Sequence, residues 1–434
     1  MGRGGTTALG RARRASYGVK PVKRLLLVCY YFPPAAGGGV ARALSFARYL
    51  PPLGWNVTVL CADAESAPLS DDSRDLRLPD GVEVVRVPMP GMAARGRRAA
   101  IGGRAGRSSG VYRMVRGAAS WVWVPDSFAA WVPEAVRVGR ELVERTRFNA
   151  MLTTSPPDSV HLVGLELGVK PWVVDFRDPW IGLTYKRPPT PFHAWRQRRL
   201  RRAVLSRGDL FLATTKTSAD LLRDASARVE ILPNGWDPDV APPAASPRAH
   251  DKLRLVYTGT LWDVPATRTF LEALAAVPSA AGAIDVELIG PHESDERTLV
   301  ERLGLTDIVH FLGQVPYEES RRRQAEADVL LLLQVHGPGY EAAIPGKLYE
   351  YLASGRPILA FLPDGEAADL VRKMGGWVVG PEDARGAQQT IGWLVAGQRP
   401  GGESFERKAL ADVYRRDRIA HRLAGLLDRA SSSR

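Results

Sequence analysis

The chain has 434 residues, of which 45% are hydrophobic and 24% charged, a composition typical of a soluble globular protein long enough for two domains. Residues 1–24 and 91–117 contain fourteen Lys and Arg and no acid, so removing them from the net charge of +12 leaves about −2 for the rest. This distribution argues against a general nucleic-acid-binding protein, which would carry its positive charge across a folded face. It suits attraction to anionic lipid or to a phosphate-bearing acceptor, or two unpartnered disordered segments.

Two cysteines, Cys29 and Cys61, lie in strand-like runs, which excludes a disulfide framework and fits a reducing cytoplasm. The first 24 residues lack an apolar stretch long enough for a signal peptide, and no window of about 18 apolar residues is present. We therefore expect a cytoplasmic protein, associated at most peripherally with the inner face of a membrane.

Short apolar runs alternate with helix-length segments along the chain. Their continuous rather than alternating hydrophobicity is typical of parallel strands buried on both faces. In chain order the runs are RLLLVCYYF, NVTVLCA, VEVVRVPM, FNAMLTTS, PWVVDF, DLFLATT and VEILPN, and then LRLVYTG, DVELIG, IVHFLG, DVLLLLQV, PILAFL and GWVVG. A Pro- and Ala-rich stretch, residues 237–251, separates the two sets and reads as a linker.

This pattern predicts the α/β class, with two Rossmann-like domains that face each other across a cleft. Ligands of such sheets bind beyond the carboxyl ends of the strands. We place the boundaries as follows: a basic disordered tail at 1–22, a first domain at 23–236, the linker at 237–251, a second domain at 252–400, and a helical segment and tail at 401–434.

Three glycines, Gly37, Gly38 and Gly39, follow the first apolar run and precede a segment with helical hydrophobic spacing that begins at Val40. Glycines at a strand-to-helix turn let the backbone approach a ligand closely and expose amides that favour an anion. The pattern is neither GxGxxG nor a P-loop, so a simple flexible turn remains an alternative.

The stretch GYEAAIPGKLYEYLASGRPILAF, residues 339–361, is the most informative part of the chain. Pro345 suits the first position of a helix and Gly355 its end. Lys347 near the helix start, with the free amides there, would bind a diphosphate, and Glu350 about one turn later can accept bonds from both ribose hydroxyls. Leu348 can face the core. The alternative is a surface helix with a solvated Lys and Glu.

These segments resemble the retaining glycosyltransferases of the GT-B fold, glycosyltransferase family 4, from residue 23 to about 395. YYFPPAAGGGVAR resembles the glycine loop that contacts the donor diphosphate and sugar, and YTGTL resembles the first strand and glycine turn of the nucleotide domain. TSPPDSVHLVG and VVDFRDPW resemble a branch that modifies bacterial polysaccharides or lipid-linked sugars, and ILPNGWD resembles the turn that closes the first domain. The resemblance implies that residues 23–236 bind the acceptor and residues 252–400 the nucleotide sugar. It implies donor contacts at the turn of Gly259 and Thr260, at the helix residues Lys347, Leu348 and Glu350, and at the backbone around Val315 in HFLGQVPYEE.

Two departures from the family pattern bear on the site. Relatives have two glutamates separated by seven residues, whereas here Ala342 lies at that distance from Glu350 and Glu341 is one residue further away. We expect Glu341 to take the first position if the loop absorbs the extra residue. The Arg that many relatives carry after the glycine of the second domain's first strand is absent from GTLWDVPATR, which leaves phosphate binding to Lys347, glycine-loop amides or Arg268.

Further candidates lie in the first domain. Asp175, Arg177 and Asp178 in VVDFRDPW follow a strand that ends at the cleft, where they would orient an acceptor or balance charge. The alternative is a buried Asp–Arg–Asp network that holds the strand end. His161, on a predicted helix after TSPP, would act near an anion or be a satisfied structural histidine.

A metal site is not supported by the sequence. The DPD motif at residues 237–239 is the one DxD of the chain, and it favours a turn. The seven histidines form neither HxxxH nor HExxH.

Two further segments suit a membrane interface. Residues 193–207 pack six arginines around apolar residues, which suits an anionic bilayer or a solvated helix face. Trp121, Trp123 and Trp131 suit a membrane interface or a core.

We therefore predict a metal-independent, retaining glycosyltransferase without a cofactor that uses a UDP- or GDP-type sugar as donor and a lipid-linked or polysaccharide precursor as acceptor. An anionic membrane surface is a further expected partner, and nucleic acid is not. Transfer to a soluble small molecule and epimerisation of a nucleotide sugar are the alternatives within this fold. A non-catalytic basic binding protein would not need the Lys347 and Glu350 helix.

Overall fold

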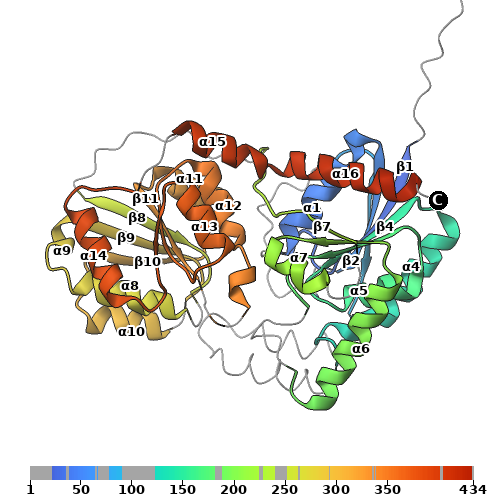
Figure 1. Cartoon of the computed structure of the whole chain (residues 1–434), viewed down its shortest axis with the longest axis horizontal. Coiled ribbons are helices and arrows are strands. Elements are labelled where there is room, and N and C mark those ends of the chain that lie inside the picture. The colour runs from blue at the N-terminus through green and yellow to red at the C-terminus, as the bar shows by residue number, and fades with distance from the viewer. Residues whose placement is uncertain are drawn as a thin grey trace, which may run out of the picture.

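The computed structural model describes residues 22–35, 39–63, 66, 78–89, 123–180, 188–223, 228–239, 252–261, 264–292, 294–334, 337, 339–400 and 404–432. Within these ranges the chain forms two α/β domains, each built on one parallel sheet with helices on both faces (Figure 1). Every apolar run quoted above contains a strand, so the predicted fold class is confirmed. Gly37, Gly38 and the basic residues 1–21 and 91–117 lie outside the described residues.

The sheet of the first domain has seven parallel strands in the order β3-β2-β1-β4-β5-β6-β7. Its strands are β1 (Lys23–Val28), β2 (Trp55–Ala62), β3 (Val82–Val87), β4 (Ala150–Ser155), β5 (Trp172–Phe176), β6 (Leu210–Ala213) and β7 (Val229–Ile231). Its helices are α1 (Val40–Tyr49), α4 (Val132–Arg145), α5 (Val160–Leu167), α6 (Pro191–Arg207) and α7 (Lys216–Arg223), with short 3₁₀ turns η1 (Pro51–Leu53) and η3 (Ala129–Trp131). The strand order reverses between β1 and β4, where ligands of such sheets bind.

The second domain repeats this design with six parallel strands in the order β10-β9-β8-β11-β12-β13. The strands are β8 (Leu253–Thr258), β9 (Ile284–Ile289), β10 (Val309–Gly313), β11 (Val329–Leu333), β12 (Ile358–Phe361) and β13 (Trp377–Val379). The helices are α8 (Pro265–Ala275), α9 (Ala280–Ala283), α10 (Ser294–Arg302), α11 (Tyr317–Glu326), α12 (Gly346–Ser354), α13 (Glu366–Lys373) and α14 (Ala384–Val395), and η5 (Tyr340–Ala342) is a 3₁₀ turn. Here the order reverses between β8 and β11.

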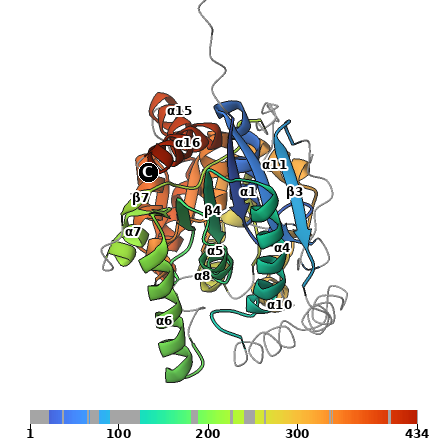
Figure 2. The same ribbon diagram turned by 90° about the vertical axis from the view of Figure 1, so that its right-hand side faces the viewer.

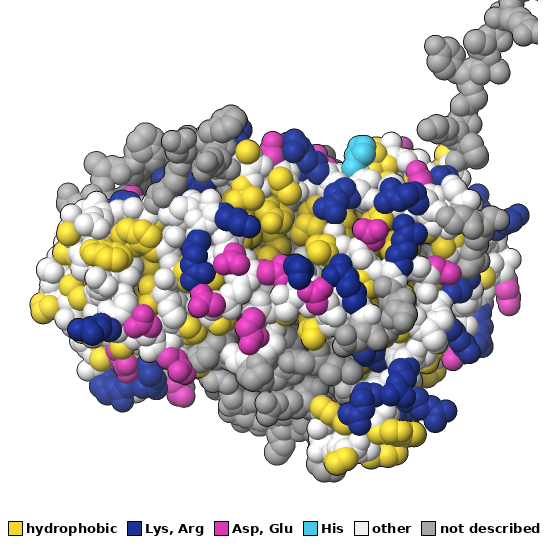
Figure 3. Space-filling view, viewed as in Figure 1, with side chains coloured by type: hydrophobic (Ala, Val, Ile, Leu, Met, Phe, Trp, Pro, Cys, Tyr) yellow, Lys and Arg dark blue, Asp and Glu magenta, His cyan; other side chains and the backbone are white. Residues whose placement is uncertain are grey.

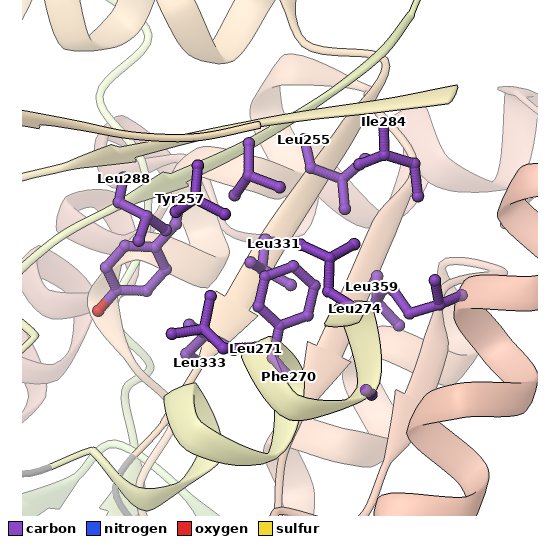
Figure 4. Packing of buried hydrophobic residues seen from close by; sticks show 14 of the residues in the cluster. Leu255, Tyr257, Phe270, Leu271, Leu274, Ile284, Leu288, Leu331, Leu333 and Leu359 are labelled. Atoms are coloured by element: carbon purple, nitrogen blue, oxygen red, sulfur yellow. The ribbon is translucent and has the colours of Figure 1, made fainter. Parts of the chain in front are cut away.

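The core of the second domain shows why the strands read as continuous apolar runs. Phe270, Leu271 and Leu274 of α8 pack against one face of the sheet, on leucines from β8, β11 and β12 (Figure 4). Residues of opposite parity on the same strands, such as Leu330 and Leu332, belong to a second buried cluster under α12 and α13. Both faces of the central strands β8, β11 and β12 are therefore covered. Tyr257 lies at one end of the cluster, with its ring buried and its hydroxyl pointing away from the leucines (Figure 4).

The C-terminal helices cross from the second domain back to the first (Figure 1). The last helix, α16 (Arg416–Ser432), follows α15 (Ser404–Val413) and buries Ile419, Leu423 and Leu427 in the core of the first domain. Its Asp428 accepts hydrogen bonds from Lys23 Nζ at 2.8 Å and from Trp55 Nε1 at 3.0 Å. Helix α16 is thus an integral part of the first domain, whereas Ala411 of α15 is buried in a cluster of the second.

The chain passes between the domains after β7 and again between α15 and α16, and these two connecting segments are hydrogen-bonded to each other. The backbone N–H of Trp236 donates to the carbonyl of Tyr414, and that of Arg416 donates to the carbonyl of Trp236, both at 3.0 Å. A side chain at Gly235 would overlap the Tyr414 carbonyl, which explains the glycine of the ILPNGWD turn. Within the described residues, no helix is both long and apolar enough to cross a bilayer.

Candidate functional site

Helix α12 is close to the one predicted from its sequence. Gly355 is left-handed, with φ 69°, and ends the helix as expected. Pro345 has an extended backbone, with ψ 135°, so the helix begins at Gly346 and the proline is its N-cap rather than its first residue. Leu348 and Leu352 are buried in the core, which fixes the orientation of the polar face.

Lys347 projects from the first turn of α12 onto the end of β8. Its Nζ donates to the Tyr257 hydroxyl at 2.7 Å and lies 4.0 Å from the centroid of that ring. Burial lowers the pKa of Lys347 to about 7, while the nearby Glu350 carboxylate acts in the opposite direction. A methyl group at Gly259, whose φ is 138°, would overlap the lysine ammonium. The positive φ favours glycine at this turn, and its missing side chain leaves room for Lys347.

Glu350 lies one turn further along α12 and is half-buried. Its Oε1 accepts a hydrogen bond of 3.2 Å from the hydroxyl of Tyr317, the first residue of α11. Val315 is two residues earlier, half-buried against the same apolar cluster as α12. The polar face of α12 therefore lies at the carboxyl ends of β8 and β10, through the contacts of Lys347 with Tyr257 and of Glu350 with Tyr317.

The carboxyl edge of this sheet is lined by backbone. Gly259, Gly290 and Gly313 end β8, β9 and β10 with φ of 138°, 132° and 67°. The Gly290 N–H donates to the Gly313 carbonyl at 2.7 Å, and a side chain at Gly290 would overlap the Gly259 backbone. The edge beside Lys347 thus carries no side chain at these three positions. Thr260 is exposed, and its carbonyl accepts a hydrogen bond of 2.9 Å from Tyr257.

Two residues expected to contact the donor, Leu348 and Glu341, do not lie on the polar face of α12. The Leu348 side chain is fully buried, so a donor contact at this residue would have to come from its backbone. Glu341 is exposed on η5, where its carboxylate accepts the Gly339 N–H at 2.7 Å. Ala342, at the family's glutamate spacing, directs its carbonyl to Thr215 Oγ1 of the first domain at 2.8 Å.

In the first domain, the Asp175 side chain is buried in a network of hydrogen bonds that holds the fold together. Its carboxylate accepts two bonds of 2.8 Å from Arg42 and one of 2.6 Å from Thr154, and its side chain is fully buried. Arg42 also donates to the carbonyls of Leu232 and Pro233 and so ties α1 and β5 to the chain after β7. The placement of Asp175 matches the buried network considered above, although its partner is Arg42 and not Arg177.

The residues after β5 are more accessible. Arg177 Nη2 donates to Asp178 Oδ2 at 3.0 Å, and 17% and 21% of these side chains are exposed. Arg177 Nη1 lies 3.7 Å from the position that a Cβ on Gly39 would occupy, so the end of the glycine loop meets this pair. The structure thus brings together Gly39, Arg177 and Asp178 beyond the β1–β4 switch point.

His161 is fully buried on α5. Its Nδ1 is 2.8 Å from Thr153 Oγ1, and its ring lies 4.7 Å from that of Phe176 and 6.0 Å from that of Trp180. This buried, ring-packed position agrees with the structural one of the two alternatives. Asp237 and Asp239 both bond to the Tyr49 hydroxyl in the turn after β7, which agrees with a turn role.

Sequence reasoning missed three polar partners: Arg42, Tyr257 and Tyr317. Arg42 looks like one more basic residue on a helix, and only the tertiary structure shows its pairing with Asp175. Tyr257 lies in a strand read as apolar, and Tyr317 lies within the stretch HFLGQVPYEE, where only Val315 was expected to contact a ligand. Within the described residues, no group of three or more His, Cys, Asp and Glu side chains gathers in a way that could hold a metal ion.

Comparisons with known proteins match each of the two domains to a glycosyltransferase family model. Residues 37–235 match the family model described as "Glycosyl transferase 4-like domain", and residues 252–396 match that described as "Glycosyl transferases group 1". A protein of Escherichia coli strain K12 named as a colanic acid biosynthesis glycosyltransferase, WcaL, is 28% identical over 194 residues. That match covers 43% of this chain and 48% of the relative, so the chain spans about half the length of this relative.

Two solved structures share the fold. Sucrose-phosphate synthase of Thermosynechococcus elongatus has a TM-score of 0.68 at 17% identity, and the match covers 95% of this chain and all of that one. HepE of Anabaena, in complex with UDP and glucose, has a TM-score of 0.61 at 15% identity over 94% of this chain and 99% of that one. With the two family models on the two sheets, this chain belongs to the GT-B glycosyltransferases of the family 4 type.

Proposed function

We propose that the protein is a retaining, metal-independent glycosyltransferase that moves a sugar from a UDP- or GDP-type donor to a lipid-linked or polysaccharide precursor. The observation that carries this proposal is the position of Lys347 and Glu350 on one face of α12, with Lys347 against the Gly259 turn of the second sheet. One end of this face is suited to phosphate, and the other is suited to a ribose.

Donor binding follows from the charges of this face. The diphosphate accepts hydrogen bonds from Lys347 and from the free amides at the start of α12, where negative charge is stabilised. Lys347 already lies beside the Gly259 backbone, so a phosphate there meets both the ammonium and the turn. Glu350, held by Tyr317, accepts hydrogen bonds from the ribose hydroxyls. A lysine in this place supplies the positive charge that a metal ion supplies in other transferases.

The proposed reaction keeps the configuration of the sugar. The acceptor hydroxyl oxygen forms a bond to the anomeric carbon on the face from which the diphosphate leaves, as the bond between that carbon and the phosphate oxygen breaks. The acceptor proton goes to the leaving phosphate oxygen. Asp175 takes no part, because Arg42 and Thr154 occupy its carboxylate. Arg177 and Asp178 hold the acceptor hydroxyl in position beside the end of the glycine loop.

The choice of donor and acceptor is supported by the similar proteins. The colanic acid relative is named for the synthesis of a polysaccharide, and the HepE structure holds UDP and glucose. Both agree with a nucleotide sugar as donor and a growing saccharide as acceptor.

The test is a panel of UDP- and GDP-sugars incubated with the full chain, with and without a polyprenyl-diphosphate-linked saccharide and with a chelator in a parallel series. We expect nucleoside diphosphate release that depends on the lipid-linked acceptor, is insensitive to the chelator, and yields a product with the anomeric configuration of the donor by NMR. Epimer formation without acceptor, transfer only to soluble small molecules, or no turnover with any donor would each refute the proposal.

A further inference from the structure

Helix α6 extends beyond the body of the first domain (Figures 1 and 2). It has 17 residues, and its C-terminal half is anchored by the buried side chains of Val204 and Leu205. Thr190 caps the other end by accepting the His193 N–H. The helix is therefore a fixed projection of the fold and belongs neither to the sheet edge nor to the donor site described above.

The projecting end carries exposed aromatic side chains. Phe192 is 57% exposed and Trp195 is 50% exposed, and their ring centroids lie 5.9 Å apart. Trp123, 40% exposed, is in the loop that Gln197 contacts through the Pro125 carbonyl at 3.1 Å. Such large aromatic side chains are normally buried, and a group of them at one projecting end points to a binding surface.

The same end carries positive charge that no acidic side chain of the described residues pairs with. Residues 191–207 contain six arginines and no Asp or Glu. Arg196, Arg198, Arg199 and Arg202 are exposed, and none of them forms an ion pair with an acid in the described part of the chain. By contrast, Arg137 on α4 is paired with both Glu134 and Glu141. Arg199 instead stacks on Trp195, 5.7 Å from its ring centroid.

We propose that this α6 tip, defined as Trp123, Phe192, Trp195, Arg196, Arg198, Arg199 and Arg202, docks the protein on an anionic phospholipid surface. Figure 3 shows yellow and dark blue side chains side by side at the lower projection, where Figure 1 places α6. Aromatic side chains of this kind settle at the headgroup level, and arginines around them meet the lipid phosphates. A soluble polyanion would use the arginines and leave Phe192 and Trp195 in water.

This inference deepens the proposed function, since a lipid-linked acceptor lies in such a surface. Its failure is distinguishable from failure of the transferase proposal, because vesicle binding is measured without donor or acceptor.

The test is co-sedimentation of the full chain with vesicles of phosphatidylcholine alone and of phosphatidylcholine mixed with phosphatidylglycerol. We expect binding to the anionic vesicles that weakens with salt. The triple change Arg198→Glu, Arg199→Glu and Arg202→Glu should weaken it by about tenfold or more. The matched control is Arg302→Glu, Lys373→Glu and Arg385→Glu, which changes the net charge equally at exposed sites of the second domain and should stay within about twofold.

The aromatic variant separates a membrane from a soluble polyanion. Phe192→Ser with Trp195→Ser should also weaken binding to anionic vesicles by about tenfold, while melting temperature and nucleotide affinity stay at wild-type values. Wild-type vesicle binding by the α6 charge variant would overturn the proposal. Loss of binding in the charge variant alone, with equal binding of the wild type to dextran sulfate, would also overturn it in favour of a polyanion site.

Discussion

The carboxyl edges of the two sheets use charged residues in opposite ways. At the first sheet, Asp175 and Arg42 are fully paired, buried and tied to three segments of the chain. At the second sheet, Lys347 has a tyrosine hydroxyl as its partner and a pKa lowered to about 7, beside a turn of glycines. The comparison teaches that a charge at a strand end is structural when the protein satisfies it completely. A partly buried charge without a bonded counter-charge costs free energy. Such a charge at a strand end indicates a site where a ligand supplies the missing partner.

The largest expected effect comes from breaking the paired edge. Asp175→Asn should lower the stability of the first domain by about 3–5 kcal/mol, because it leaves the Arg42 charge buried without its counter-charge. Turnover per folded molecule should remain close to that of the wild type. Thermal unfolding and active-site-normalised rates measure the two quantities.

The comparison variant at the same edge is Asp178→Asn. Its carboxylate is 21% exposed, so the melting temperature should change little, while turnover should fall by roughly 10²-fold if it positions the acceptor. If Asp178→Asn loses as much stability as Asp175→Asn, both residues are structural and the distinction between them is wrong.

At the second sheet, Lys347→Met should weaken nucleotide binding by about 1.5–3 kcal/mol, through loss of a charged hydrogen bond to phosphate. Stability should not fall, because the lysine is buried at a cost. Lys373→Met, an exposed lysine on α13 of the same domain, is the matched control. Calorimetry with UDP and GDP measures the difference, and identical affinities for wild type and Lys347→Met would remove this residue from the donor site.

The pH dependence of donor binding is a smaller effect with a definite sign. The free protein has a Lys347 pKa of about 7, and a bound diphosphate favours the ammonium form and raises that pKa. Affinity should therefore be greatest below pH 7 and fall above it, by up to about tenfold per pH unit until the pKa of the complex is reached. The nucleotide sugar that binds best is the ligand to use, and Lys347→Met should show a flat profile. A profile that falls equally in the variant would assign the titration to another group.

The smallest expected effect concerns the contact between the two edges. Glu366 on α13 accepts the N–H groups of Lys216 at 3.0 Å and Thr217 at 2.7 Å, and so caps α7 of the first domain. Glu366→Ala should cost about 0.5–2 kcal/mol and shift the domains toward a more open arrangement. Asp383→Ala removes a cap within the second domain, on α14, and should lower stability without opening the domains. Small-angle scattering compares the two, and an unchanged radius for Glu366→Ala would show that this cap does not hold the domains together.

Much of the fold was predictable because buried parallel strands leave a local trace. The central strands are covered on both faces, so a strand such as β11, Val329–Leu333, is apolar at every position. The end of α12 was also predictable, since Gly355 takes a left-handed conformation that favours glycine. The return of α16 to the first domain was not predictable. Its amphipathic pattern specifies a buried face and not which domain buries it.

The sequence by itself determined the order of the strands along the chain, the helix that carries Lys347 and Glu350, and the family resemblance. These features depend on local periodicity, helix ends and motif spacing, which a linear chain displays directly. The tertiary structure decided which charges are structural and which are available: Asp175 and Arg177 are two residues apart, yet Asp175 pairs with Arg42, 133 residues away. Such a pairing depends on burial and on contacts between distant segments, and the spacing of neighbouring residues specifies neither.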